Sequence, residues 1–317
     1  MKIFITRQLP GNIERKLKNE GFTVKTFRGD EPISAKELIK KSKNTDGIIS
    51  LLTDRIDSSI IDQLKHCKVI ANYAVGYNNI DIEYAKSKGI VVTNTPDILT
   101  DATADLAVSL VLACARKIVD GEKFMRAKKF KGWEPQLFLG VELKGKTVGI
   151  IGAGRIGQAT AKRLKAFGTN IIYYSRKEKP GFEIETGATK ATLNSLLKNS
   201  DIISLHIPLS KETENLLSAD KLKLLKPSAI LINTARGEVL DEKYLIKMLK
   251  QKKIHSAGFD VYEGEPKVNK ELLKLDNVVL LPHLGSATTE ARTEMAELCA
   301  ENVIRVLKGK SPKTPVN

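Results

Sequence analysis

The sequence predicts an α/β protein that contains two doubly wound parallel sheets, each with helices on both faces. Its length of 317 residues is enough for two domains with separate hydrophobic cores. Short apolar runs alternate with amphipathic stretches along the chain, which is typical of parallel sheets. A glycine-rich turn opens the second half, and turns of this kind join a strand to a helix in such folds.

The first hundred residues contain five apolar runs of strand length, with helical patterns near residues 11–20, 34–43, 57–66 and 81–88 between them. The five runs are KIFIT, TVKTF, GIISLL, KVIANYA and IVVTNT. A long helix then begins near Thr100 or Asp101, either of which can cap it. Because the middle of this helix is apolar nearly all round, we expect it to be buried between domains or at a subunit interface.

The second half of the chain contains six further apolar runs that predict strands. They are TVGIIG, NIIYYS, DIISLHIP, AILINTA, HSAGFDV and NVVLLPH. A last long helix follows, with Ser286 or Thr288 as its cap. The final residues, KSPKTPVN, are expected to be frayed or extended.

The composition is that of a soluble enzyme, with 42% hydrophobic and 28% charged residues. No apolar run approaches the roughly 18 residues of a membrane span, and the start MKIFITRQLPGN is too polar for a signal peptide. The three cysteines, Cys67, Cys114 and Cys299, are widely spaced and odd in number. This pattern argues against a disulfide framework or a zinc site and favours a reducing, cytoplasmic location.

The net charge of +15 raises the question of nucleic-acid binding. The lysines, however, are scattered along amphipathic helices among acidic residues, and aromatic residues make up only 5% of the chain. We therefore interpret the charge as a basic solvated surface that attracts anionic ligands over long range. Neither a nucleic-acid partner nor a membrane partner is predicted.

The glycine-rich turn has the spacing of a dinucleotide-binding motif. Gly152, Gly154 and Gly157 follow an apolar strand and open an amphipathic helix in KTVGIIGAGRIGQATAKRLKAFG. Gly152 permits the tight turn, Gly154 lets the backbone approach a pyrophosphate, and Gly157 lets the helix pack on the strand. The positive end of the helix dipole faces the phosphates. The alternative is a glycine-rich turn that binds no ligand.

The next strand ends roughly 20 residues further on, where NAD-binding proteins present an acidic side chain to the ribose 2′-OH. Here the strand is followed by Ser175, Arg176 and Lys177. A hydroxyl and two cations suit a 2′-phosphate, so we predict that NADP(H) is preferred over NAD(H). In the alternative, Arg176 and Lys177 are ordinary loop charges and Glu178 reaches back to the ribose.

Three chemically capable residues follow three predicted strands. Arg236 lies in AILINTARGEV, Glu265 in GFDVYEGEP and His283 in NVVLLPHLGSAT. In open α/β sheets, ligands bind at the carboxyl ends of the strands, so these side chains are expected to converge beside the cofactor. Arg236 can bind a carboxylate and an adjacent carbonyl oxygen. His283 can donate a proton as hydride arrives, and Glu265 would fix its tautomer and stabilise its charged form, without a metal.

Two further positions are candidates for ligand contacts. Val75 and Gly76 follow the strand KVIANYA and offer backbone N–H groups to a small carboxylate, although a plain turn would have the same sequence. His206 lies at the carboxyl end of the strand DIISLHIP, a position from which it can contact the cofactor.

Together these segments resemble the D-2-hydroxyacid dehydrogenases, and within them the glyoxylate/hydroxypyruvate reductase branch. The likeness covers nearly the whole chain and runs through NYAVGYNNID, VTNTPDILTDATADLA, GWEPQLFLG, TVGIIGAGRIGQ, YYSRK, LINTARGEVLDE, GFDVYEGEP and LPHLGSAT. It implies a Rossmann NADP-binding domain, residues 100–287, inserted into a flavodoxin-like substrate domain, residues 1–99 plus 288–317. It also implies a homodimer, and two domains that close on the substrate.

The resemblance implies a set of site residues. Arg236, Glu265 and His283 would be catalytic, and the substrate would contact Val75, Gly76, Arg236, His283 and Trp133, the last of these from the same subunit or from a partner subunit. The cofactor would contact Thr103, Gly152, Gly154, Arg155, Ile156, Gly157, Ser175, Arg176, Lys177, His206, Thr234, Ala235, Asp260 and Gly285.

The favoured hypothesis is NADPH-dependent reduction of glyoxylate or hydroxypyruvate to glycolate or D-glycerate. A D-3-phosphoglycerate dehydrogenase, or another D-2-hydroxyacid dehydrogenase, is the enzymatic alternative. A redox-sensing binding protein, similar to the corepressors that share this fold, is the alternative from another class. The intact Arg, Glu and His set favours an enzyme.

Overall fold

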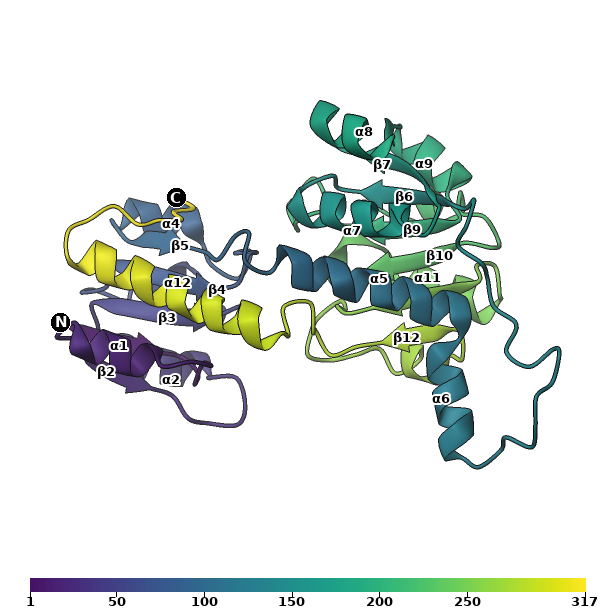
Figure 1. Cartoon of the computed structure of the whole chain (residues 1–317). Helices are drawn as coiled ribbons and strands as arrows, with labels where there is room; N and C mark the ends of the chain where they lie inside the picture. Colours follow the sequence, from purple (N-terminus) through teal and green to yellow (C-terminus); the bar gives the residue numbers. More distant parts are fainter. The chain divides into compact units, whose positions relative to one another are not determined.

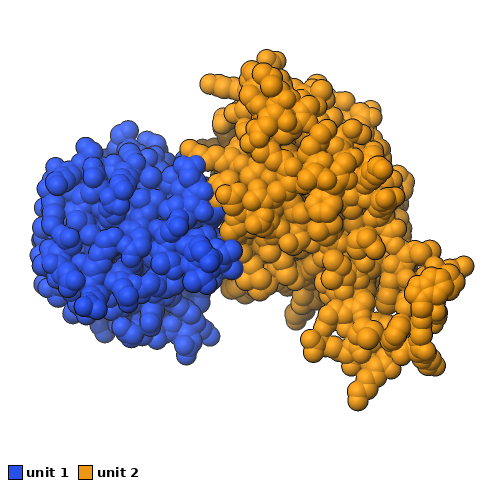
Figure 2. All heavy atoms as spheres, viewed as in Figure 1, with its two compact units in different colours: residues 1–99, 286–317 blue, residues 100–285 orange.

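The computed structural model describes residues 1–317 and divides into two compact units. Residues 1–99 and 286–317 form the first unit, and residues 100–285 form the second (Figure 2). The chain therefore leaves the first unit once and returns to it. None of the helices combines the length and the apolar character that a membrane span requires.

The first unit is built on a five-stranded parallel sheet in the order β2-β1-β3-β4-β5, the order of flavodoxin-like folds. Its strands are β1 (Lys2–Ile5), β2 (Thr23–Thr26), β3 (Gly47–Leu51), β4 (Val69–Tyr73) and β5 (Val91–Thr93). Each corresponds to one predicted apolar run. Successive residues alternate between the two faces, and both faces are buried.

Helices cover both faces of this sheet. One face packs against α2 (Ala35–Ser42), α3 (Ser58–Ile61) and α4 (Ile82–Ser87), with Phe4, Ile48 and Ile70 in the shared core. The other carries α1 (Ile13–Asn19) and α12 (Thr289–Leu307), which lie side by side (Figure 1). Of the two predicted caps for the last helix, the structure uses Thr288, whose Oγ1 accepts a hydrogen bond from the N–H of Ala291 at 3.1 Å.

The second unit is built on a seven-stranded parallel sheet in the order β12-β11-β10-β9-β6-β7-β8. Six of its strands were predicted, and the two-residue strand β8 was not, because two residues give no periodic pattern. The strands are β6 (Thr147–Ile151), β7 (Asn170–Tyr174), β8 (Thr189–Lys190), β9 (Ile202–Leu205), β10 (Ile230–Asn233), β11 (Ser256–Phe259) and β12 (Val278–Leu280). The order reverses between β9 and β6, as in Rossmann folds.

Two hydrophobic cores lie on the two faces of this sheet. One forms with α5 (Thr100–Arg116) and α7 (Arg155–Lys165), and the other with α9 (Leu193–Asn199), α10 (Ala219–Leu222) and α11 (Glu242–Lys250). The remaining short helix, α8 (Pro180–Thr186), packs beside α7. Cys67, Cys114 and Cys299 are all buried free thiols.

The long helix predicted to start near Thr100 ends at Arg116. Lys117 adopts a left-handed conformation with φ of 51°, and a second helix, α6 (Ile118–Arg126), follows it. Helix α6 and the segment after it project from the second unit (Figure 1), and none of the residues of α6 is buried.

Candidate active site

The strands of the second unit's sheet are parallel, so their carboxyl ends all lie at the same end of the sheet. The predicted site residues follow these strands and are therefore found at that end. The loops follow the strand order from β12 to β7. They carry His283 after β12, Asp260 and Glu265 after β11, Arg236 after β10, His206 after β9, Gly152 and Gly154 after β6, and Ser175, Arg176 and Lys177 after β7. Along this row of loops, the acid–base candidates therefore follow β12 and β11. The candidate phosphate-binding loops follow β6 and β7.

His283 and Glu265 form a hydrogen-bonded pair, with 2.8 Å between Nδ1 and Oε2. The other carboxylate oxygen, Oε1, accepts the N–H of Tyr262 at 2.9 Å. Burial raises the pKa of Glu265, but the hydrogen bond and charge of His283, the N–H of Tyr262 and the charge of Arg236 outweigh burial and hold it below its usual value. The pair keeps about a quarter of each side chain exposed, 27% for His283 and 29% for Glu265, so a ligand can reach the ring.

Arg236 is held by the residues just before it in the chain. Its Nη1 donates to the carbonyl of Ala235 at 2.7 Å, and its own carbonyl accepts Nδ2 of Asn233 at 2.8 Å. Burial lowers the pKa of the guanidinium, while the charges of Glu265 and Glu238 oppose this effect. An arginine under these opposing influences stays charged at neutral pH.

The loops that carry Arg236 and Glu265 touch at a glycine. A Cβ atom on Gly237 would lie 2.0 Å from the carbonyl carbon of Tyr262 and 2.1 Å from the nitrogen of Glu263. Any side chain at this position would push the two loops apart. Gly237 therefore sets the spacing between the cationic and acid–base parts of the site.

Asp260, Thr103 and Gly285 were predicted as cofactor contacts, and in the structure Gly285 is hydrogen-bonded to both of the other two. The carboxylate of Asp260 accepts the N–H groups of Leu284 at 2.6 Å and Gly285 at 2.8 Å. Oγ1 of Thr103 donates to the carbonyl of Gly285 at 3.0 Å. Burial raises the pKa of Asp260, and the two N–H groups and the charge of His283 oppose it. These bonds fix the two residues that follow His283.

Sequence reasoning missed the role of Tyr262. Its backbone N–H holds Glu265, and its hydroxyl donates to the carbonyl of Leu281 at 2.8 Å, two residues before His283. Burial raises the pKa of the phenol to about 12, so the hydroxyl remains a donor. No local pattern in the sequence signals a hydroxyl that acts on a different loop.

The glycine-rich turn has the shape that a pyrophosphate requires. A Cβ on Gly152, whose φ is 100°, would lie 2.5 Å from the carbonyl oxygen of His206, and one on Gly157 would lie 2.1 Å from that of Gly152. A Cβ on Gly154 would meet no atom within 4 Å, so the space in front of this residue is open. The N-terminus of α7, which begins at Arg155, is next to that open space.

Two more features fit a dinucleotide. Oγ1 of Thr234 is buried and has no hydrogen-bond partner, at the carboxyl end of β10, where a ligand could satisfy it. After β7, the hydroxyl of Ser175 donates to the carbonyl of Lys177 and closes a turn whose cations, Arg176 and Lys177, are exposed. An orphan hydroxyl, an open glycine and two exposed cations together fit a phosphorylated dinucleotide.

His206 lies at the carboxyl end of β9, and its side chain makes a local contact. Its Nε2 lies 2.8 Å from Oγ of Ser204, and burial lowers the pKa of the ring to about 3. The ring is therefore neutral at physiological pH, and it does not supply a positive charge to a phosphate.

Val75 and Gly76 lie in the first unit, in the loop after β4, and both are half-buried. Trp133 lies in the segment of the second unit that follows α6 and is 84% exposed. The role of this aromatic residue in closing the substrate pocket stays a prediction.

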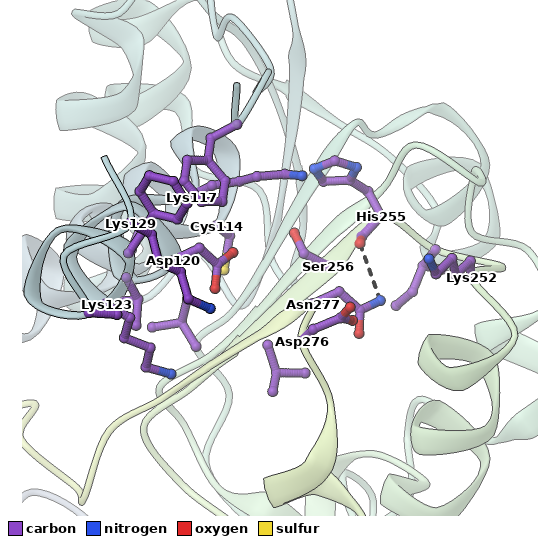
Figure 3. Close-up of a pocket in the computed structure, with 18 of the residues that line it drawn as sticks. Cys114, Lys117, Asp120, Lys123, Lys129, Lys252, His255, Ser256, Asp276 and Asn277 are labelled. Atoms are coloured by element: carbon purple, nitrogen blue, oxygen red, sulfur yellow. Dashed lines mark hydrogen bonds between the residues drawn. The ribbon is translucent and has the colours of Figure 1, made fainter. Parts of the chain in front are cut away.

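A cavity of about 730 Å³ lies at the end of the second unit's sheet opposite the site. It is formed where α6 and the projecting segment face the amino ends of β11 and β12. Figure 3 shows Lys117, Lys123 and Lys129 on one side of it, and His255, Ser256 and Asn277 on the other.

Comparisons with known proteins agree with this geometry. Residues 108–285 match the family model described as D-isomer specific 2-hydroxyacid dehydrogenase, NAD binding domain. The whole chain is 52% identical to a glyoxylate reductase from Thermococcus litoralis, over 96% of that protein, and 50% identical to one from Pyrococcus furiosus, over 95%. The chain belongs to the D-isomer specific 2-hydroxyacid dehydrogenase family. It is an NAD(P)-dependent D-2-hydroxyacid dehydrogenase, and the resemblance found in the sequence is confirmed.

Solved structures with this fold are similar to the chain over nearly its whole length. The TT0316 protein from Thermus thermophilus superposes with a TM-score of 0.95 at 42% identity, over 100% of both chains. An NADPH-dependent glyoxylate/hydroxypyruvate reductase from Sinorhizobium meliloti, in complex with NADP and malonate, has a TM-score of 0.88 at 33% identity. That match covers 99% of this chain and 96% of the other. The predicted fold class is thereby confirmed.

Proposed function

We propose that this dehydrogenase reduces glyoxylate to glycolate, and hydroxypyruvate to D-glycerate, with NADPH. The observation that carries the proposal is the pair formed by His283 and Glu265, 2.8 Å apart, at the same sheet edge as Arg236. The relatives described as glyoxylate reductases, which are about half identical over this whole chain, support the choice of substrate.

In the proposed reaction, His283 is the acid and Glu265 is its partner. Because Nδ1 faces Glu265, Nε2 is the ring nitrogen that can donate a proton to the carbonyl oxygen of the substrate. Glu265 stabilises the charged ring before the transfer and keeps its orientation afterwards. NADPH, when bound, supplies the hydride that reaches the carbonyl carbon.

Arg236 is the proposed binding group for the carboxylate and the carbonyl oxygen of the substrate. Its guanidinium offers several N–H donors in one plane, which suits two adjacent oxygens of a 2-oxo acid. As negative charge develops on the carbonyl oxygen, a fixed cation beside it lowers the barrier. We assign the remaining carboxylate contacts to the backbone N–H groups of Val75 and Gly76 in the first unit.

The preference for NADPH is proposed on the loop after β7. Arg176 and Lys177 are exposed cations there, and no acidic residue stands at the position of Ser175. The bond from Ser175 to the carbonyl of Lys177 closes this turn and supports a shape in which both cations can approach a 2′-phosphate. The NADPH-dependent relative from Sinorhizobium meliloti agrees with this assignment.

We further propose a homodimer in which the projecting segment contacts a second copy. Five of the ten exposed large hydrophobic side chains of the chain are in α6 or in the segment that follows it. They are Ile118, Met125, Phe130, Trp133 and Leu139. Exposed apolar groups concentrated in one segment are typical of an interface, and Trp133 would then reach the partner's substrate. Light scattering after gel filtration tests this: a monomer at micromolar concentration would contradict it.

The proposed activity is tested by product identification. The purified protein is incubated with NADPH and glyoxylate or hydroxypyruvate, and glycolate and D-glycerate are quantified against cofactor consumed. We expect one product molecule per NADPH oxidised. Oxidation of 3-phosphoglycerate with no reduction of either 2-oxo acid would replace this function with the phosphoglycerate alternative.

A further inference from the structure

The loop after β4 presents three successive backbone N–H groups that bind nothing in the chain. The carbonyl of Ala74 accepts the N–H of Thr95 at 2.9 Å, that of Val75 accepts Nδ2 of Asn94 at 2.8 Å, and that of Gly76 accepts Nδ2 of Asn72 at 2.9 Å. In a trans peptide the N–H points opposite to the C=O. The N–H groups of residues 75, 76 and 77 therefore point away from the groups that hold their carbonyls, and none donates a hydrogen bond within the chain.

This arrangement is a built anion cradle, because consecutive free N–H groups in a loop attract negative charge. Its geometry depends on the two asparagines. Asn72 is fully buried, and its Oδ1 accepts Oγ of Ser50 at 3.2 Å. Its amide nitrogen donates to the carbonyl of Gly76 at 2.9 Å and to Oδ1 of Asn79 at 3.3 Å. Asn79 completes the support by donating to the carbonyls of Leu51 and Asp54, at 3.1 and 3.0 Å.

Asn94 is held in turn by the end of the chain. Its N–H donates to the carbonyl of Thr314 at 3.2 Å, and its carbonyl accepts Oγ1 of Thr314 at 2.6 Å. The same segment pairs with the free edge of β5, through an antiparallel bridge between Thr93 and Pro315 and a 2.9 Å bond from the N–H of Val316 to Val92. Of the two states predicted for the final residues, the structure has the extended one, and this segment supports the cradle.

We infer that Asn94 is a positioning residue for the substrate carboxylate, acting through the carbonyl of Val75, and that Thr314 supports it from the C-terminal segment. The inference rests on the proposed function for the identity of the carboxylate. The competing explanation is that the asparagine bonds only stabilise a strand-to-helix turn. The two differ in what they predict for ligand affinity.

The test compares Asn94→Ala with wild type. The readouts are KM for glyoxylate, Ki for oxamate, which binds as an unreactive carboxylate, and Kd for NADPH. If Asn94 orients the cradle, KM and Ki both rise, by about 5- to 30-fold, since the bond to a charged ligand is weakened. Values of kcat and the Kd for NADPH stay within about twofold, because carboxylate binding is shared by the ground state and the transition state.

Thr45→Ala is the matched control. Thr45 is buried in the same unit, and its hydroxyl donates to the carbonyl of Ser42 at 2.7 Å, at the amino end of β3, away from the cradle. We expect this variant to lose thermal stability without a change in KM or Ki. Thr314→Val keeps the side-chain shape and removes only the hydroxyl. It should raise KM and Ki in the same direction by a smaller factor.

The inference is overturned if Asn94→Ala is folded and has wild-type KM and Ki, whatever its melting temperature. A rise in KM for Thr45→Ala equal to that of Asn94→Ala would also overturn it, because the effect would then follow stability. If wild type does not reduce glyoxylate, the proposed function fails. Calorimetric oxamate binding to the NADPH-loaded protein then decides the inference separately, and equal affinity in wild type and Asn94→Ala would reject it.

Discussion

Nδ1 of His283 lies 2.8 Å from Oε2 of Glu265, although the two residues follow different strands. The contact depends on a third residue, since Tyr262 holds the Glu265 carboxylate with its N–H and the loop before His283 with its hydroxyl. His283 itself has a positive φ of 56°, a conformation that a non-glycine residue keeps only when its surroundings fix it. The acid–base pair is therefore set by the contacts between loops.

Replacing His283 by Gln removes the proposed proton donor and keeps a polar side chain of similar size. We expect kcat for glyoxylate reduction to fall by about 10²- to 10⁴-fold, with NADPH affinity unchanged. Steady-state kinetics and NADPH fluorescence titration measure the two effects. His255→Gln is the control, because His255 lies at the opposite edge of the sheet, and it should keep wild-type kcat.

Replacing Glu265 by Gln removes a carboxylate whose pKa is held below its ordinary value of 4.5. A lowered folded-state pKa contributes stability above the unfolded value, and this contribution is lost as the pH falls through the folded-state value. The difference in melting temperature between wild type and Glu265→Gln should therefore be largest near neutral pH and shrink below about pH 4.5. A difference that does not depend on pH would contradict this assignment. We also expect kcat to fall by roughly 10²-fold.

Replacing Asp260 by Asn places an amide donor against one of the two N–H groups that the carboxylate now accepts. We expect a loss of about 1–3 kcal/mol in the free energy of unfolding, together with a lower kcat, because the loop after His283 loosens. Chemical denaturation and kinetics check the two effects. Asp201→Asn removes a comparable carboxylate at the amino end of β9, where it accepts the N–H of Thr147 at 2.9 Å. It should lose stability and keep kcat.

Removing both cations after β7, with Arg176→Ala and Lys177→Ala together, should weaken NADPH and leave NADH unaffected. We expect KM for NADPH to rise by about 10- to 100-fold, since two charge-assisted contacts to one phosphate are lost. Lys198→Ala, which removes one exposed positive charge from the end of α9, tests whether the loss of a positive charge elsewhere in this unit weakens NADPH. Equal losses with both cofactors would show that the two cations do not bind the 2′-phosphate.

The periodic features of the fold could be predicted from the sequence. Apolar runs of five to eight residues marked every strand except the two-residue β8, and glycine spacing marked the turn before α7. The break of the long helix was missed, because a left-handed Lys117 leaves no sign in the composition or the periodicity. Backbone conformations of this kind depend on tertiary packing.

The site was predictable where chemistry follows a strand end, as for Arg236, Glu265 and His283. The residues that hold the site were not, because each acts on a distant segment. Asn94 and Thr314 are 220 positions apart in the chain, and the hydroxyl of Tyr262 acts on a different loop. Asp260 was predicted as a cofactor neighbour, and its bonds to the loop after His283 became visible only in the structure.

A comparison of kcat/KM for glyoxylate reduction with NADPH and with NADH tests the proposed reaction and the proposed cofactor together. We expect turnover with both cofactors and a preference for NADPH of at least about tenfold, which corresponds to roughly 1.4 kcal/mol. A preference for NADH would keep the dehydrogenase but contradict the assignment of Ser175, Arg176 and Lys177. No reduction of glyoxylate with either cofactor would contradict the proposed function itself.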